Sequence, residues 1–221
     1  MSVLKQKPIA IPGTSAEELA PKAASCWSCG GPVGVDALFC ATCDAVQPPG
    51  TRDHFARLGL DPTFDIDVKT LEKKYFDLQR KLHPDRFATK TPRERAISQQ
   101  QATSLNDAYE TLADPLRRAA YIAHLKGIDV LNEGCNQIAD PVVLMEAMEL
   151  REAVADAKSV AQVDMIAGNA QADIDVCIKE LSAAFAKNDM DEASRLTTRF
   201  KYLRKLIEEA RQKKARLKAG T

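Results

Sequence analysis

The sequence predicts an all-α protein in which a helical hairpin domain is followed by a three-helix bundle and preceded by a small cysteine knuckle. Aromatic residues make up only 5% of the 221 residues, and Ala, Leu, Lys, Glu and Arg dominate. This composition favours helix over sheet. After residue 51, the chain contains stretches in which apolar residues recur three or four positions apart, and helix-capping signals separate one stretch from the next. Two closely spaced cysteine pairs define the knuckle.

Residues 1–25 precede the first cysteine and have no sustained apolar period. They contain three prolines and a glycine, so we expect a disordered tail. They also lack the apolar core of a signal peptide and contain no arginine. No apolar run in the chain approaches the ~18 residues of a membrane span. These features favour a cytoplasmic location without membrane contact, with the mitochondrial matrix as the alternative.

Four cysteines define residues 26–47. Cys26 and Cys29 form one Cys-x-x-Cys pair, and Cys40 and Cys43 form a second pair after ten intervening residues. This spacing is typical of a zinc site in which four thiolates fill a tetrahedral shell and leave no position for water. We therefore expect one structural zinc ion. Its binding would supply the folding free energy of a segment that has little core of its own.

The next part, residues 51–126, carries signals for two helices at its start. The first is expected from Asp53 to Leu58, and the second runs from its N-cap, Asp67, to Leu82. The apolar stripe of the second helix contains Leu71, Tyr75, Leu78 and Leu82. Basic side chains project from its opposite side, namely Lys69, Lys73 and Arg80.

A His83-Pro84-Asp85 tripeptide ends the second helix. Pro84 has no N–H to continue the helix, and it pushes His83 out of the α region. A third helix must then return along the second one, so the tripeptide lies at the turn of a helical hairpin. A tripeptide alone is a weak motif, but this position makes it a strong candidate for a functional corner.

Two more helices complete this part of the chain. Thr91 and Glu94 form a capping box with proline at the first helical position. Asp114, again followed by proline, begins a fourth helix that we expect to stop at Gly127. The buried side of the third helix is expected to contain Ile97, Gln101, Leu105, Ala108 and Leu112.

Residues 140–218 are expected to form three helices, which end near Lys158, Lys187 and Lys218. Their apolar residues alternate in spacings of three and four, which is typical of coiled-coil-like packing in a three-helix bundle. Cys177 falls on such a stripe and is expected to be a core residue. A core stripe of the first helix contains Val143, Ala147, Leu150, Val154 and Ala157. A second apolar stripe with neighbouring acids is typical of a partner-binding face, and it contains Leu144, Met145, Met148, Glu149 and Glu152.

From residue 51 to its end, the chain resembles the HscB family, the J-domain co-chaperones of iron–sulfur cluster assembly. The resemblance is carried by residues 78–87, 106–112 and 144–152. The first segment is typical of any J domain, and the third, on the expected bundle, is typical of HscB. The four-cysteine segment also resembles that of the eukaryotic, mitochondrial members, whereas many bacterial members lack it.

The resemblance implies an L-shaped co-chaperone with a J domain over residues 51–126 and a scaffold-binding bundle over residues 140–218. Its expected role is to stimulate the ATPase of a DnaK/HscA-type chaperone and to deliver the IscU-type iron–sulfur scaffold to it for cluster transfer. The residues expected to contact the chaperone are His83, Pro84, Asp85, Lys69, Lys73 and Arg80. The residues expected to contact the scaffold are Leu144, Met145, Met148, Glu149, Glu152 and Tyr202.

Two other functions remain open at this point. One is a generic J-domain co-chaperone for unfolded clients, and the other is a zinc-ribbon regulator that binds nucleic acid. The net charge of +0 disfavours the second, because general nucleic-acid binding needs a basic surface. The sequence has no phosphate-cradling glycine loop and no nucleophile–base constellation. We therefore expect no enzyme activity in this chain and place the ATP chemistry in its partner.

Overall fold

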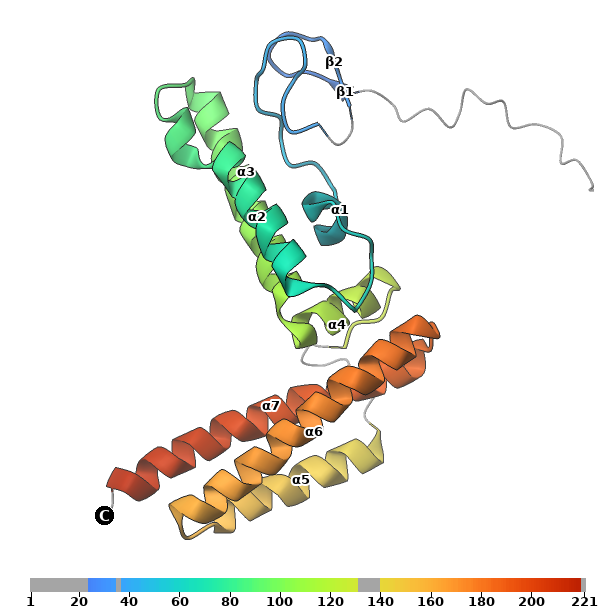
Figure 1. Ribbon diagram of the computed structural model, residues 1–221, viewed down its shortest axis with the longest axis vertical. Coiled ribbons are helices and arrows are strands. Elements are labelled where there is room, and N and C mark those ends of the chain that lie inside the picture. The colour runs from blue at the N-terminus through green and yellow to red at the C-terminus, as the bar shows by residue number, and fades with distance from the viewer. Residues whose placement is uncertain (1–23, 35–36, 131–139, 220–221) are drawn as a thin grey trace, which may run out of the picture.

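The computed structural model describes residues 24–34, 37–130 and 140–219. The expected tail therefore lies almost wholly outside the described residues. The described part is built from seven α-helices, one short 3-10 helix and one two-stranded ribbon. The hairpin domain and the bundle meet at a steep angle and together form an L (Figure 1). No helix among the described residues is long and apolar enough to cross a bilayer.

The hairpin domain contains four α-helices and the 3-10 helix. They are α1 (His54–Leu58), α2 (Val68–Leu82), η1 (Pro84–Phe87), α3 (Pro92–Ala113) and α4 (Pro115–Leu125). Helices α2 and α3 lie side by side and antiparallel, and η1 forms the turn between them (Figure 1). The apolar sides of α1, α2 and α3 pack into one core, as their periodicity predicts.

The helix starts follow the capping signals. The Asp67 carboxylate accepts hydrogen bonds from the first-turn amides of α2, and Asp114 does the same for α4. Thr91 and Glu94 form both hydrogen bonds of the capping box at the start of α3. After α1, Gly59 adopts a φ of 61°, a left-handed conformation that suits glycine at a helix end. These predictions are therefore confirmed to within one residue.

The bundle consists of α5 (Pro141–Asp156), α6 (Val160–Ala186) and α7 (Met190–Ala219). The expected end of α5 at Lys158 is wrong by two residues. Ser159 and Gln162 form a capping box that starts α6, so the chain has already left the helix at that point. The core seam of α6 and α7 is buried as expected, including Cys177. On α5, by contrast, the expected core residues Ala147 and Leu150 are only half-buried.

The two arms of the L are joined by side-chain packing as well as by the chain. Phe64, in the loop between α1 and α2, stacks on Phe185 of α6 with ring centroids 5.2 Å apart. The Arg204 guanidinium of α7 donates to both carboxylate oxygens of Asp114 at 2.7 and 2.8 Å. These contacts give the hairpin domain and the bundle a defined relative position.

The cysteine segment begins with a two-stranded ribbon, β1 (Ala24–Ser25) paired antiparallel with β2 (Pro32–Val33). An isolated bridge joins Phe39 and Val46 further along. The segment lies at the same end of the hairpin as η1, far from the bundle (Figure 1).

Candidate metal centre and docking surfaces

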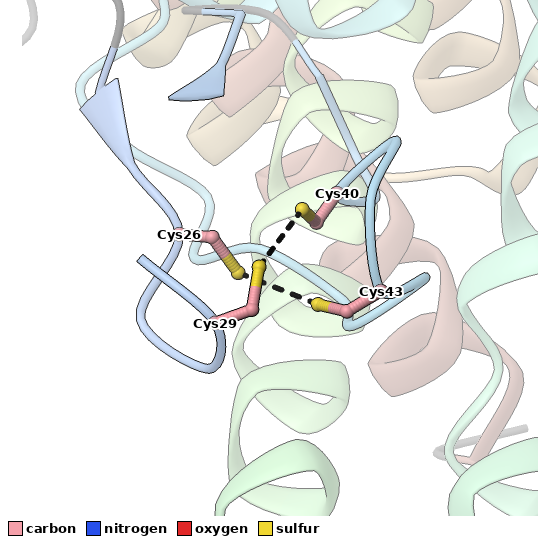
Figure 2. A group of neighbouring side chains, drawn as sticks. All are labelled: Cys26, Cys29, Cys40 and Cys43. Atoms are coloured by element: carbon pink, nitrogen blue, oxygen red, sulfur yellow. Dashed lines mark hydrogen bonds between the residues drawn. The ribbon is translucent and has the colours of Figure 1, made fainter. Parts of the chain in front are cut away.

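The four cysteine sulfurs converge on one point from two loops (Figure 2). All four lie within 4.8 Å of one another. The Sγ atoms of Cys26 and Cys43 are 3.7 Å apart, as are those of Cys29 and Cys40. A tetrahedral ion with metal–sulfur bonds of ~2.3 Å requires sulfur–sulfur distances of about 3.8 Å. Two of the distances match this value, and all four sulfurs lie close enough together to bind one four-coordinate metal ion.

The two cysteine loops repeat the same backbone structure. The amide of Gly30 donates to the carbonyl of Cys26 at 2.9 Å, and the amide of Asp44 donates to the carbonyl of Cys40 at the same distance. Gly30 and Asp44 occupy equivalent left-handed positions, with φ of 73° and 59°. In this conformation the loop turns back sharply and directs both sulfurs of a pair to one side. A Cβ at Gly31 would lie 3.1 Å from Thr42 Oγ1 and 3.3 Å from the Cys29 sulfur, so any larger residue there would have to displace these neighbours slightly.

The surroundings of the sulfurs favour thiolates that share a cation. Backbone hydrogen bonds from Cys29 and Ser28 lower the pKa of the Cys26 thiol to about 6. The amide of Gly31 lowers the pKa of Cys29, but its contacts with neighbouring sulfurs, that of Cys43 foremost, outweigh this and raise it to about 12. Four sulfurs at this spacing cannot all be thiolates unless a positive charge lies between them. A divalent metal ion supplies that charge.

The cysteine segment is docked on the hairpin domain. The side chain of Val46 is fully buried in the core that contains α1, α2 and α3. The Gln101 side-chain amide on α3 donates to the Gln47 carbonyl at 2.8 Å, in a buried position. The guanidinium of Arg93 lies 4.5 Å from the ring centroid of Trp27, a cation–π contact. The sequence predicted Gln101 on the buried side of α3, but not that it holds the cysteine segment.

The corner of the hairpin is held by local hydrogen bonds. The backbone amide of Asp85 donates to Nδ1 of His83 at 3.3 Å, and the amide of Arg86 donates to the His83 carbonyl at 3.0 Å. Pro84 opens η1, so a short 3-10 helix lies where the sequence predicts only a turn. The Asp85 side chain is 90% exposed, so its carboxylate projects into solvent.

The three basic residues expected to contact the chaperone are all exposed on α2, with Arg80 near the corner and Lys69 at the opposite end of the helix. Arg80 pairs with Asp77 on the same helix, so part of its charge is compensated. Lys69 and Lys73 form no ion pair within the described part of the chain, although hydrogen bonds from Thr70 and the nearby charge of Lys69 lower the pKa of Asp67.

The second stripe of α5 lies on the surface, as its pattern predicts. Met145 is 62% exposed and Met148 is 64% exposed, and both neighbouring acids, Glu149 and Glu152, are exposed as well. Leu144 is half-buried. An exposed pair of methionines on a regular helix is typical of an adaptable binding surface.

Tyr202 of α7 lies next to a different side of α5. It is half-buried and borders a shallow groove between the two helices, which Ala147, Leu150 and Arg151 also line. Arg151 closes the groove through a bidentate ion pair with Glu209, at 2.7 and 3.0 Å. The structure therefore brings Tyr202 beside α5.

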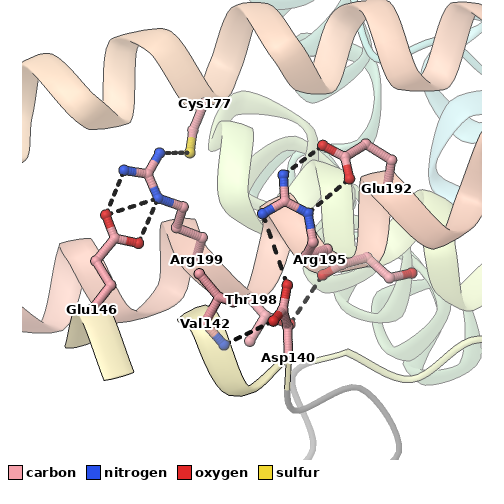
Figure 3. A network of polar contacts seen from close by, with 9 residues as sticks. Asp140, Val142, Glu146, Cys177, Glu192, Arg195, Thr198 and Arg199 are labelled. Carbon is pink, nitrogen blue, oxygen red and sulfur yellow. Dashed lines mark hydrogen bonds and ion pairs between the residues drawn. The ribbon is translucent and has the colours of Figure 1, made fainter. Parts of the chain in front are cut away.

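An arginine that the sequence reading missed attaches α5 to the rest of the bundle (Figure 3). The Arg199 guanidinium of α7 donates to both carboxylate oxygens of Glu146 on α5, at 2.6 to 3.2 Å. The same group donates to the Cys177 sulfur of α6 at 3.4 Å. Its hydrogen bonds lower the pKa of Glu146, and burial raises the pKa of Cys177. Arg199 thus joins all three helices directly behind the exposed methionines.

Known families match both helical parts of the chain. Residues 53–121 match the DnaJ domain, and residues 139–211 match the HSCB C-terminal oligomerisation domain. The chain is 36% identical over 199 residues to the iron–sulfur cluster co-chaperone protein HscB of Mus musculus, covering 88% of this chain and 85% of that protein. It is also 36% identical over 193 residues to HscB of Homo sapiens, covering 86% and 82%.

Solved structures lead to the same family. The crystal structure of human co-chaperone protein HscB superposes with a TM-score of 0.80 at 34% identity, covering 86% of this chain and 98% of that one. Chaperone HscB from Vibrio cholerae superposes with a TM-score of 0.66 at 33% identity, covering 75% and 99%. With both helical parts matched and the mammalian relatives aligned over more than four fifths of each chain, this protein belongs to the HscB family of iron–sulfur cluster co-chaperones and contains its J domain.

Proposed function

We propose that this chain stimulates the ATPase of a DnaK/HscA-type chaperone and delivers the IscU-type iron–sulfur scaffold to it. The observation that carries the proposal is the Asp85 carboxylate, 90% exposed at a corner whose backbone is held by His83 and η1. A carboxylate in a fixed position makes a strong, directional contact with an arginine of a partner. Lys69 and Lys73 lie in the first turns of α2, at the end away from the corner, and raise the rate of association with an acidic surface.

Stimulation requires that the corner bind one state of the chaperone more tightly than another. A ligand shifts a conformational equilibrium only by its difference in affinity for the two states. The corner therefore contributes its contacts selectively to the hydrolysis-competent state, and the reacting groups belong to the chaperone. In this arrangement Pro84 presets the backbone, and Asp85 makes the contact that distinguishes the states.

A steady-state ATPase assay with the cognate chaperone tests this role. The wild-type chain is expected to raise the hydrolysis rate, and Asp85→Asn is expected to abolish the increase because the amide lacks the charge. Since Asp85 is exposed, the variant should keep the wild-type circular-dichroism spectrum and melting temperature. Full stimulation by Asp85→Asn would refute the assignment of the corner.

The scaffold is assigned to the α5 face formed by Leu144, Met145, Met148, Glu149 and Glu152. Two attachment sites on one rigid L raise the local concentration of scaffold at the chaperone. Adding scaffold to the ATPase assay should therefore increase stimulation further with the full chain. The match of the bundle to an HscB-specific domain favours this role over that of a generic co-chaperone for unfolded clients.

We assign zinc to the four-cysteine site, because four thiolates at tetrahedral spacing suit this ion and hold it in a closed, structural shell. Metal analysis of freshly purified, reduced protein should give one zinc per chain. Cys40→Ser should lose the ion, because three thiolates leave the shell incomplete. Cys177→Ser is the matched control, since Cys177 is buried in the bundle, and it should retain a full equivalent. Absence of zinc from the wild-type protein would contradict the assignment.

A further inference from the structure

A groove separates the cysteine segment from the corner of the hairpin. Phe39 and Asp44, around the second cysteine pair, form one wall. Lys81, Arg86 and Lys90, from the end of α2 through the start of α3, line the other. The groove lies immediately beside the corner, because Lys81 and Arg86 flank the His83-Pro84-Asp85 tripeptide.

The two walls are held in a fixed relation. The buried hydrogen bond from Gln101 to Gln47 and the burial of Val46 attach the cysteine segment to α3. The stacking of Arg93 on Trp27 adds a second attachment near the start of the same helix. The second cysteine loop therefore occupies a defined position relative to the corner.

The groove carries a small excess of positive charge, because its three bases are accompanied by two acids, Asp44 and Glu94. Lys81, Arg86 and Lys90 form no ion pair with any carboxylate in the described ranges, and Arg86 donates only to the backbone carbonyl of Arg80. The Glu94 carboxylate, on the same wall as the bases, accepts the capping hydrogen bonds of Thr91, and these bonds together with the charge of Lys90 lower its pKa. Asp44 is the acid on the opposite wall.

We propose that this groove binds an acidic segment of the same ATPase chaperone that docks at Asp85, so that the zinc module forms part of the chaperone-binding surface. This inference rests on the function proposed above for the corner. Carboxylates of the segment would pair with Lys81, Arg86 and Lys90, and an apolar side chain would contact Phe39. The charge of the groove and its continuity with the corner favour this occupant over any other.

Two single substitutions with opposite expected effects test the groove. The measurement is ATPase stimulation as a function of co-chaperone concentration, at low salt and without scaffold. Lys90→Glu should raise the half-maximal concentration by about threefold, which is typical of one exposed charge pair. Asp44→Asn should lower it by about twofold, because it removes a repulsive carboxylate. Asparagine tolerates the left-handed φ at this position. Maximal stimulation should be unchanged in both.

Lys158→Glu is the matched control, since Lys158 is exposed near the far end of the bundle. It should behave as wild type, and all three variants should retain one metal equivalent and the wild-type melting temperature. A Lys158→Glu shift equal to that of Lys90→Glu would mean general electrostatic attraction and would overturn the site. Wild-type behaviour of the two groove variants, with Asp85→Asn inactive, would overturn the groove alone. Absence of stimulation by the wild-type chain would overturn both the groove and the proposed function.

Discussion

At the hairpin corner, Asp85 presents one carboxylate from a backbone fixed by Pro84 and η1, whereas on α5 the methionines Met145 and Met148 present flexible side chains from a regular helix. The corner is defined by position, because a charged contact depends on where two or three atoms lie. The α5 face is defined by area and adaptability, because apolar contacts add up over many atoms. The corner therefore suits a contact that distinguishes two states of a partner, and the α5 face suits the binding of a folded protein.

The two surfaces also differ in how they are held. The backbone hydrogen bonds of the corner join residues two or three positions apart, as between His83 and Asp85, and the Arg86 side chain reaches back six positions to Arg80. The α5 face depends on Arg199, which reaches Glu146 from 53 residues further along the chain. Disturbing the bundle should therefore affect scaffold binding and leave chaperone stimulation intact.

The largest effect that separates the surfaces is expected from Met145→Ala combined with Met148→Ala. Loss of both side chains should remove about 2 kcal/mol of apolar contact with the scaffold, a roughly 30-fold rise in Kd by isothermal titration calorimetry. Because both residues are exposed, the melting temperature should not change, and ATPase stimulation without scaffold should be that of wild type. The control is Met165→Ala, since Met165 is 63% exposed on α6. Equal scaffold binding by the double variant and this control would contradict the assignment of α5.

A smaller effect is expected from Arg199→Met, which removes the ion pair between α7 and α5 without changing the exposed face of α5. The change leaves the half-buried Glu146 carboxylate without its partner, which should lower the free energy of unfolding by about 2 kcal/mol. Scaffold affinity should fall only severalfold, because the methionines remain but α5 is less firmly placed. Arg211→Met is the control, since Arg211 is exposed and pairs with Glu208 on its own helix. Its unfolding free energy should stay within about 0.5 kcal/mol of wild type.

Local signals explain which parts of the fold could be predicted from the sequence. The starts of α2, α3 and α4 were predicted to within one residue, because an N-cap, followed by proline in α3 and α4, acts within one turn of the chain. The paired cysteines likewise predicted a metal site, since their spacing already places two sulfurs together. The end of α5 was missed because its stop is set by Ser159, the cap of the next helix, and no break in the apolar pattern of α5 marks it.

The contacts that assemble these parts join residues far apart in the sequence, and periodicity carries no information about them. The sequence predicted that Gln101 is buried, but only the fold brings it to Gln47, 54 residues earlier. Arg199 looked like one of many bases on α7, and its role follows from the positions of Glu146 and Cys177 on two other helices. The composite groove beside the corner is a further consequence of such long-range packing.

The smallest expected effect is on the stability of the protein in acid, and it concerns the bundle and not the corner. Hydrogen bonds from Arg199 lower the pKa of Glu146 below its usual value of 4.5. A carboxyl group with a lowered pKa in the folded state stabilises the protein above its unfolded pKa. That contribution is lost as the pH falls from about 4.5 through the lowered value. Glu146→Gln should therefore show a smaller loss of unfolding free energy over this range than wild type, as measured by urea denaturation at successive pH values.

Lowered pKa values of Asp67, Glu94 and Asp114 give both proteins a common acid-sensitive background, so only the difference between wild type and Glu146→Gln reports on Glu146. The difference should be smaller than the effect of Arg199→Met, because a protonated Glu146 still accepts hydrogen bonds from Arg199. Parallel curves for wild type and Glu146→Gln, such as we expect for the exposed control Glu208→Gln, would mean that this ion pair does not hold α5 in place.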